Sequence, residues 1–187
     1  MAVIALDIGG TKISGALVNK RLEILKSVRV PTQARKGRRY VLEMIDLVIS
    51  SLLNNSKHKV TALGISMPGY FTDDGAIQFC GNALSFMVGV RLEDRLEKKF
   101  SIPVILENDA NCFTIAESIM GAGQDHDLVL GVIWGTGIGA GVVMKDEKGK
   151  GAVFRGSHGG AMELGMMPLY DQHNKRRTTL EKVAGGQ

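Results

Sequence analysis

The sequence is poor in cysteine, in aromatic residues and in long apolar runs. It has only two cysteines, Cys80 and Cys112, and they form no CxxC pair, which argues against a disulfide framework and a cysteine-built metal site. No apolar run reaches the roughly 18 residues that a bilayer span requires, and the chain opens on a short strand-like run instead of a targeting sequence. We therefore expect a cytoplasmic protein with no membrane partner.

Charge is also nearly balanced, with a net value of +4 over 187 residues. The basic residues are scattered apart from two short clusters, residues 35–39 and 175–177, and no aromatic residue is interleaved with either cluster. Both are typical of a solvated loop or helix start, so we predict no nucleic-acid partner. Apolar residues make up 44% of the chain, enough for a globular core.

Apolar periodicity predicts an α/β fold with a mixed sheet and flanking helices. Strands are expected at residues 3–6, 13–18, 22–30, 60–66 and 104–107, and helices at 40–53, 91–100 and 110–120. Strands that alternate with helices form partly parallel sheets, whose ligands collect at the carboxyl ends of the strands. Asp7, Gly69 and Asp109 all follow such ends.

A second strand–turn–strand unit follows a polar boundary at residues 121–124. The apolar segments 128–134 and 138–144 flank the turn Gly135-Thr136-Gly137, and the arrangement repeats the first hairpin around Gly9-Gly10-Thr11. This repetition predicts a duplicated architecture, in which each half offers one phosphate-facing turn.

The segment from Asp7 to Lys12 places a carboxylate beside a glycine turn whose backbone N–H groups can approach a phosphate. A Gly-Gly pair in a hairpin is also ordinary turn geometry, so the segment alone leaves both interpretations open. It lacks Walker A spacing, and the glycines from Gly135 to Gly139 lead into a strand, so neither turn predicts a P-loop or Rossmann site.

Residues 107–111, Glu-Asn-Asp-Ala-Asn, stand where a buried strand turns into a helix. Their side chains can project into a crevice near the helix N-terminus. The alternative is that Asn108 or Asp109 only caps the helix.

Four segments together resemble the ROK family of bacterial sugar kinases and sugar-responsive repressors: residues 7–12, 107–111, 135–141 and 159–168. The resemblance implies an actin-like (ribonuclease H-like) fold of two lobes that close over a sugar and ATP. The first lobe is expected at residues 1–117, and residues 118–187 are expected to begin the second.

The resemblance also implies a role for each matching residue. Asp109 corresponds to the catalytic base, and Asp7 to the residue near Mg²⁺. The sugar-binding positions correspond to Gly69, Asn82, Asn108, Asp109, Glu163 and Glu181. The turns that face the phosphates of ATP correspond to Gly9, Gly10, Thr11, Lys12, Gly135, Thr136 and Gly137.

The chain departs from the family at its structural zinc site. Family members carry a Gly-Glu-x-Gly-His element and then a cysteine-rich element, but here residues 162–166 are Met-Glu-Leu-Gly-Met and residues 171–181 contain no cysteine. The four histidines, His58, His126, His158 and His173, are too scattered to replace those ligands. We expect no zinc, and a loop over residues 171–178 that is mobile or ordered by lobe packing alone.

These features predict an ATP:hexose phosphotransferase that resembles glucokinase or fructokinase and forms a homodimer. The sequence does not fix the sugar. One alternative is the sugar-binding effector domain of a ROK regulator. Regulators carry a helix-turn-helix domain before the first strand, whereas Met1 lies just before that strand here, which favours the kinase. The other is a catalytically weak sugar-binding protein.

Related kinases continue beyond Glu181, so we also expect an incomplete second lobe, an open sheet edge and poor ATP turnover by residues 1–187 alone.

Overall fold

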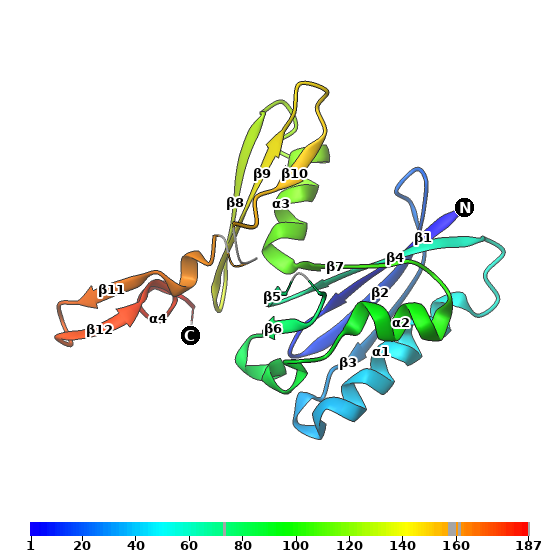
Figure 1. Ribbon diagram of the computed structural model, residues 1–187, viewed down its shortest axis with the longest axis horizontal. Coiled ribbons are helices and arrows are strands. Elements are labelled where there is room, and N and C mark those ends of the chain that lie inside the picture. The colour runs from blue at the N-terminus through cyan, green and yellow to red at the C-terminus, as the bar shows by residue number, and fades with distance from the viewer. Residues whose placement is uncertain (73, 157–159, 161, 187) are drawn as a thin grey trace. The chain divides into compact units, whose positions relative to one another are not determined.

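The computed structural model describes residues 1–72, 74–156, 160 and 162–186, and of Asn82 it describes only the backbone. His158 and two residues of the segment 159–168, Gly159 and Ala161, lie outside the described residues. The chain forms two compact units, Met1–Asp109 and Ala110–Gln187 (Figure 1). This division falls at the start of a helix, and the boundary expected near residue 117 stays a prediction.

The first unit is built on a five-stranded mixed sheet with the strand order β3-β2-β1-β4-β7. Its antiparallel half consists of β1 (Ala2–Ile8), β2 (Lys12–Asn19) and β3 (Ile24–Pro31). Its parallel half adds β4 (Val60–Met67) and β7 (Val104–Asn108) beside β1. The mixed sheet predicted from the sequence is confirmed.

Two helices, α1 (Gly37–Leu53) and α2 (Leu92–Phe100), cover one face of this sheet. Residues of β1 alternate between buried and exposed along its length, as expected for a strand with one face on the core. The core joins Ile4, Leu6 and Ile65 of the sheet to Ile45 of α1 and Leu96 of α2. A short hairpin of β5 (Tyr70–Phe71) and β6 (Ile77–Phe79) follows β4, and the 3₁₀ turns η1 (Ala34–Lys36) and η2 (Asn82–Met87) complete the unit.

The second unit is built on a three-stranded antiparallel sheet with the order β10-β9-β8. It contains β8 (Leu128–Trp134), β9 (Ile138–Lys145) and β10 (Gly151–Val153). Helix α3 (Asp109–Met120) packs closely on the glycines of this sheet, because a Cβ at Gly141 would lie 2.7 Å from the Asn111 Oδ1 atom and one at Gly139 3.2 Å from the Ala110 Cβ. The strand–turn–strand repeat predicted from the sequence is present.

The other face of β8 is apolar and exposed. Leu128, Leu130, Val132 and Trp134 alternate along it and remain accessible. Among the described residues β8 pairs with β9 alone, so its second edge is open. Within the described part of the chain, no helix is both long and apolar enough to cross a membrane.

The region expected to be a loop forms a hairpin, so that expectation is wrong. Strand β11 (Pro168–Asp171) pairs antiparallel with β12 (Arg176–Thr179), after η3 (Leu164–Met166) and before α4 (Leu180–Ala184). The Asp171 carboxylate accepts hydrogen bonds from the His173 and Asn174 backbone N–H groups, at 3.0 and 3.1 Å, and from the Asn174 side chain. This Asx-type turn orders the segment locally, which the sequence reasoning overlooked.

A charged cluster links α1 to α2 in the first unit. The Asp46 side chain is only 12% exposed, and it accepts hydrogen bonds from Arg95 Nη1 at 2.8 Å and from Lys99 Nζ at 2.7 Å. Burial alone would raise the Asp46 pKa, but the hydrogen bonds and charges of Arg95 and Lys99 outweigh it, so the pKa lies below its ordinary value. The cluster therefore stabilises the folded state as long as Asp46 is ionised.

We predict that Asp46→Asn lowers the free energy of unfolding by about 1–3 kcal/mol at pH 7, because a half-buried guanidinium and ammonium lose their carboxylate. Since the folded pKa is depressed, this contribution is present above the unfolded value of about 3.9 and is lost as the pH falls through the lower folded value. Urea unfolding at several pH values measures it.

The matched control is Glu43→Gln on the same helix, because the Arg39–Glu43 pair is exposed and contributes little. A stability loss in Asp46→Asn no larger than in Glu43→Gln at pH 7 would contradict the assignment.

Candidate functional site

The first of the two turns predicted to face phosphate lies between β1 and β2. The Gly9 N–H donates to the Lys12 carbonyl at 2.9 Å. The N–H groups of Gly10 and Thr11 have no partner among the described residues, while Asp7 is exposed at the end of β1. The turn therefore presents two adjacent donors beside a carboxylate and the exposed Lys12 ammonium.

A residue that the sequence reasoning missed holds this turn in place. Thr32 is fully buried just after β3. Its Oγ1 hydroxyl donates to the Gly9 carbonyl at 2.6 Å, and its N–H donates to the Thr11 carbonyl at 2.9 Å. A lone threonine after a strand gives no sequence signal for this contact, which depends on the register between β2 and β3.

The carboxyl ends of β4 and β7 bring two predicted residues together. The Asn108 Nδ2 group donates to the Gly69 carbonyl at 2.9 Å. Gly69 has a φ of 128°, and a Cβ there would overlap the carbonyl oxygen of Phe79. The loop after β4 is thus held in a conformation that only glycine readily adopts.

Asp109 follows at once, as the first residue of α3, where the helix dipole favours a negative charge. Burial raises the pKa of the nearby Cys80 thiol to about 11, and the charge of Asp109 adds to the rise. Cys80 therefore stays protonated at neutral pH and donates to the Pro68 carbonyl at 3.0 Å. Asp109, Asn108, Gly69 and Cys80 form one local cluster within the first unit.

Asn82 belongs to the same region by its place in the chain, since it begins η2 two residues after Cys80. Its side chain lies outside the described residues, so its expected contact with a sugar stays a prediction.

The second turn predicted to face phosphate joins β8 to β9 in the second unit. The Gly135 N–H donates to the Gly137 carbonyl at 2.9 Å. Among the described residues, the N–H groups of Thr136 and Gly137 have no partner, just as in the first turn. Each turn thus leaves two adjacent N–H groups without a partner among the described residues, although the closing hydrogen bond reaches three residues on in the first turn and two in the second.

One of the two predicted carboxylates, that of Glu181, contacts the second turn. The Glu181 Oε2 atom accepts a hydrogen bond from the Ile138 N–H at 3.0 Å, and Glu163 precedes η3, where its carbonyl accepts from the Met166 N–H at 3.0 Å. Met166 itself is exposed. The described residues of each unit therefore hold one part of the predicted site.

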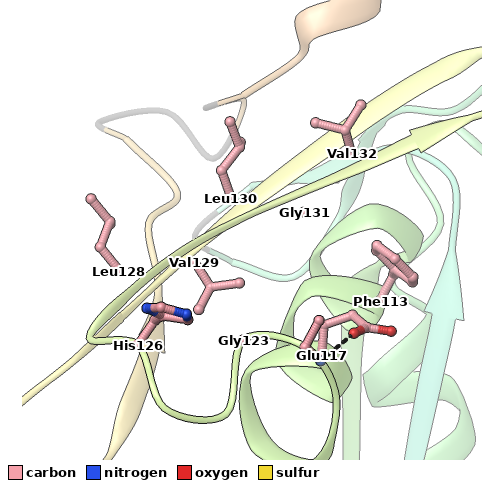
Figure 2. Close-up of a pocket in the computed structure, with 10 residues that line it drawn as sticks. Phe113, Glu117, Gly123, His126, Leu128, Val129, Leu130, Gly131 and Val132 are labelled. Atoms are coloured by element: carbon pink, nitrogen blue, oxygen red, sulfur yellow. Dashed lines mark hydrogen bonds between the residues drawn. The ribbon is translucent and has the colours of Figure 1, made fainter.

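The cavity beside α3 is separate from these residues. It has a volume of about 390 Å³ and lies between α3 and the open edge of β8. Figure 2 shows its lining, with Phe113 and Glu117 on the helix and Leu128, Leu130 and Val132 on the strand. None of the predicted site residues lines it, and its walls are mostly apolar.

The chain is similar to known proteins over most of its length. The model of the ROK family matches residues 3–180. The chain is 34% identical to a beta-glucoside kinase of Listeria innocua, over 89% of this chain and 53% of that protein. It is 34% identical to an N-acetyl-D-glucosamine kinase of Haemophilus influenzae, over 88% of this chain and 51% of that protein.

A solved structure is similar as well. It is a ROK family glucokinase from Streptomyces griseus in complex with glucose and AMPPNP, with a TM-score of 0.74 and 33% identity over 88% of this chain and 50% of that one. The chain thus spans about half the length of the curated relatives and of this structure.

We predict that Gly69→Ala lowers the free energy of unfolding by at least about 2 kcal/mol, because an alanine at this φ is strained and its methyl group meets the Phe79 carbonyl. Gly64→Ala, on the preceding strand, is the matched control, since nothing lies within 4 Å of a Cβ there. Chemical unfolding of both variants measures the difference, and equal stabilities would contradict the geometry of this loop.

Proposed function

The chain belongs to the ROK family, and from that premise we propose that the protein transfers the γ-phosphoryl group of ATP to a hydroxyl of a hexose. The fold is the actin-like fold of ROK sugar kinases. One observation carries the proposal: Asn108 and Asp109 lie at the carboxyl end of β7, and the Asn108 side chain donates a hydrogen bond to the Gly69 carbonyl.

Asp109 is the proposed general base. It accepts the proton of the sugar hydroxyl as that oxygen bonds to the γ-phosphorus and the bond from phosphorus to the β–γ bridging oxygen of ATP breaks, which releases ADP. Phosphoryl transfer depends mainly on positioning and charge neutralisation, so a base at a rigid strand end suits this reaction. Asn108, Gly69 and Asn82 on the first unit, and Glu163 and Glu181 on the second, are the proposed sugar ligands.

The two glycine turns are the proposed sites for the phosphates of ATP. Gly9, Gly10, Thr11 and Lys12 form the first, and Gly135, Thr136 and Gly137 form the second. Two N–H donors in each turn fit an anionic ligand, and the Lys12 ammonium adds a positive charge. Asp7 fits a Mg²⁺ ion, an ion that prefers oxygen ligands and would neutralise charge on the phosphates when bound.

The three relatives described above are named for different substrates, at 33–34% identity to this chain. The proposal is therefore limited to the class of hexoses. A homodimer, a cytoplasmic location and the absence of a nucleic-acid partner stay predictions.

We predict that Asp109→Asn, in the protein at its full encoded length, lowers kcat at least about a hundredfold while sugar affinity changes little, since a general base contributes 10²–10⁴ in rate. Steady-state kinetics with ATP and isothermal titration with the sugar measure the two quantities. The control is Asp94→Asn, on the exposed Arg91–Asp94 pair. A near-normal kcat in Asp109→Asn would remove Asp109 from the role of base.

The residues that replace the family's zinc ligands do not fit zinc. The Asp171 carboxylate is occupied by the turn of its own hairpin, and Met166 offers only a thioether. No group of three or more His, Cys, Asp or Glu side chains that could hold a metal is found among the described residues. Zinc in a structural site needs four such ligands.

We therefore predict less than about 0.1 zinc per chain after purification, and an unfolding temperature that a chelator does not change, because a structural zinc supplies much of its domain's folding energy. Elemental analysis and thermal unfolding with and without EDTA measure these quantities. Stoichiometric zinc bound near His173 would contradict this account.

The loss of the histidine also bears on the alternative of a catalytically weak sugar-binding protein or a sugar-sensing regulator. Where the family's histidine contacts the sugar, Met166 has only a weak acceptor. We expect lower sugar affinity, or a preference for a sugar that lacks or inverts one hydroxyl. Sugar binding without sugar-dependent ADP release would favour these alternatives over a kinase.

A further inference from the structure

The Glu181 side chain is hydrogen-bonded to the backbone at the end of the second phosphate-facing turn. Its Oε2 atom accepts a hydrogen bond at 3.0 Å from the N–H of Ile138, which directly follows Gly137. The same oxygen would lie 2.6 Å from a Cβ at Gly137 and 3.1 Å from one at Gly165. A side chain at Gly137 would displace this carboxylate and one at Gly165 would crowd it, so the two glycines leave the space in which it reaches the Ile138 N–H.

The start of the turn is held by the residues that follow Glu181. The Trp134 Nε1–H group donates to the Ala184 carbonyl at 2.7 Å, and the Gly186 N–H donates to the Gly135 carbonyl at 2.8 Å. The short helix α4 and the two residues after it thus contact the turn at both ends, through Glu181 at one end and residues 184–186 at the other. Thr136 and Gly137, which carry the two N–H donors, lie between these contacts.

We propose that Glu181 is a positioning residue that fixes the turn 135–138 for phosphate binding, in addition to its proposed contact with the sugar. This inference rests on the proposed function, because it assigns a task to the turn that we propose for ATP. It makes Glu181 the link through which sugar and nucleotide affect each other's affinity, with one carboxylate oxygen holding the turn and the other available to a second contact.

The charge of Glu181 provides a sharp test of this role. By Coulomb attraction and repulsion alone, removing a negative charge beside a phosphate site strengthens phosphate binding. If Glu181 positions the turn, its removal weakens binding instead, because Ile138 loses its acceptor. Glu181→Gln removes the charge but retains an acceptor oxygen, and Glu181→Ala removes both.

The first measurement is amide hydrogen exchange of residues 134–139 in the full chain. We expect exchange at Ile138 to be at least about tenfold faster in Glu181→Ala, and near the wild-type rate in Glu181→Gln and in the control Val183→Ala, an exposed position on the same helix. Gly137→Ala, which displaces the carboxylate without removing it, should also speed exchange. Unchanged exchange in Glu181→Ala would overturn the positioning role.

The second measurement is AMPPNP affinity with Mg²⁺, followed by the fluorescence of Trp134, the single tryptophan of the sequence. We expect Glu181→Ala to weaken affinity at least about fivefold, the lower end of typical coupling effects, and Glu181→Gln to bind as well as wild type or better. Tighter binding by both variants would show a purely electrostatic effect and overturn the inference. If the wild-type protein binds no AMPPNP, the proposed function fails, whereas the exchange measurement still decides whether Glu181 holds the turn.

Discussion

The parallel pairing of β1, β4 and β7 is the constraint on which the candidate site depends. Asp7 lies opposite Ser66 in the register of β1 and β4, and Ser66 lies opposite Glu107 in that of β4 and β7. Three strands thus have their carboxyl ends side by side, and residues a hundred positions apart in sequence lie there together. Apolar side chains of α1 and α2 pack on one face of the sheet and hold this register. A change that loosens the core would therefore also disturb the geometry of the candidate site.

Glycines then set how closely the backbone can approach a ligand or a neighbouring element. Gly69 permits a backbone conformation that places its carbonyl against Asn108, and Gly137 leaves the space that the Glu181 carboxylate occupies. At both positions the absence of a side chain allows a polar side chain to hydrogen-bond with the backbone. Such contacts fix the positions of backbone donors and acceptors, and preorganisation of this kind is what the proposed phosphoryl transfer requires of a protein.

The sequence predicted the elements better than the contacts between them. The run 128–134 coincides with β8 because an apolar segment between a polar boundary and a glycine turn has few alternatives. The contact of Thr32 with Gly9 and that of Glu181 with Ile138 depend on register and on loop conformation, which leave no periodic signal. The hairpin around Asp171 was missed because each of its strands has only four residues, and its order comes from one side chain that caps a turn.

The central claim is that these groups serve catalysis of phosphoryl transfer and not sugar sensing alone. The most direct measurement is ADP release by the full-length protein with ATP and Mg²⁺ against a panel of hexoses, including glucose, fructose, allose and N-acetylated hexosamines, with the sugar product identified by mass spectrometry. The account predicts that at least one hexose stimulates ADP release and yields a sugar phosphate in one-to-one ratio with ADP. Binding of a hexose with no increase in ADP release across the panel would contradict it.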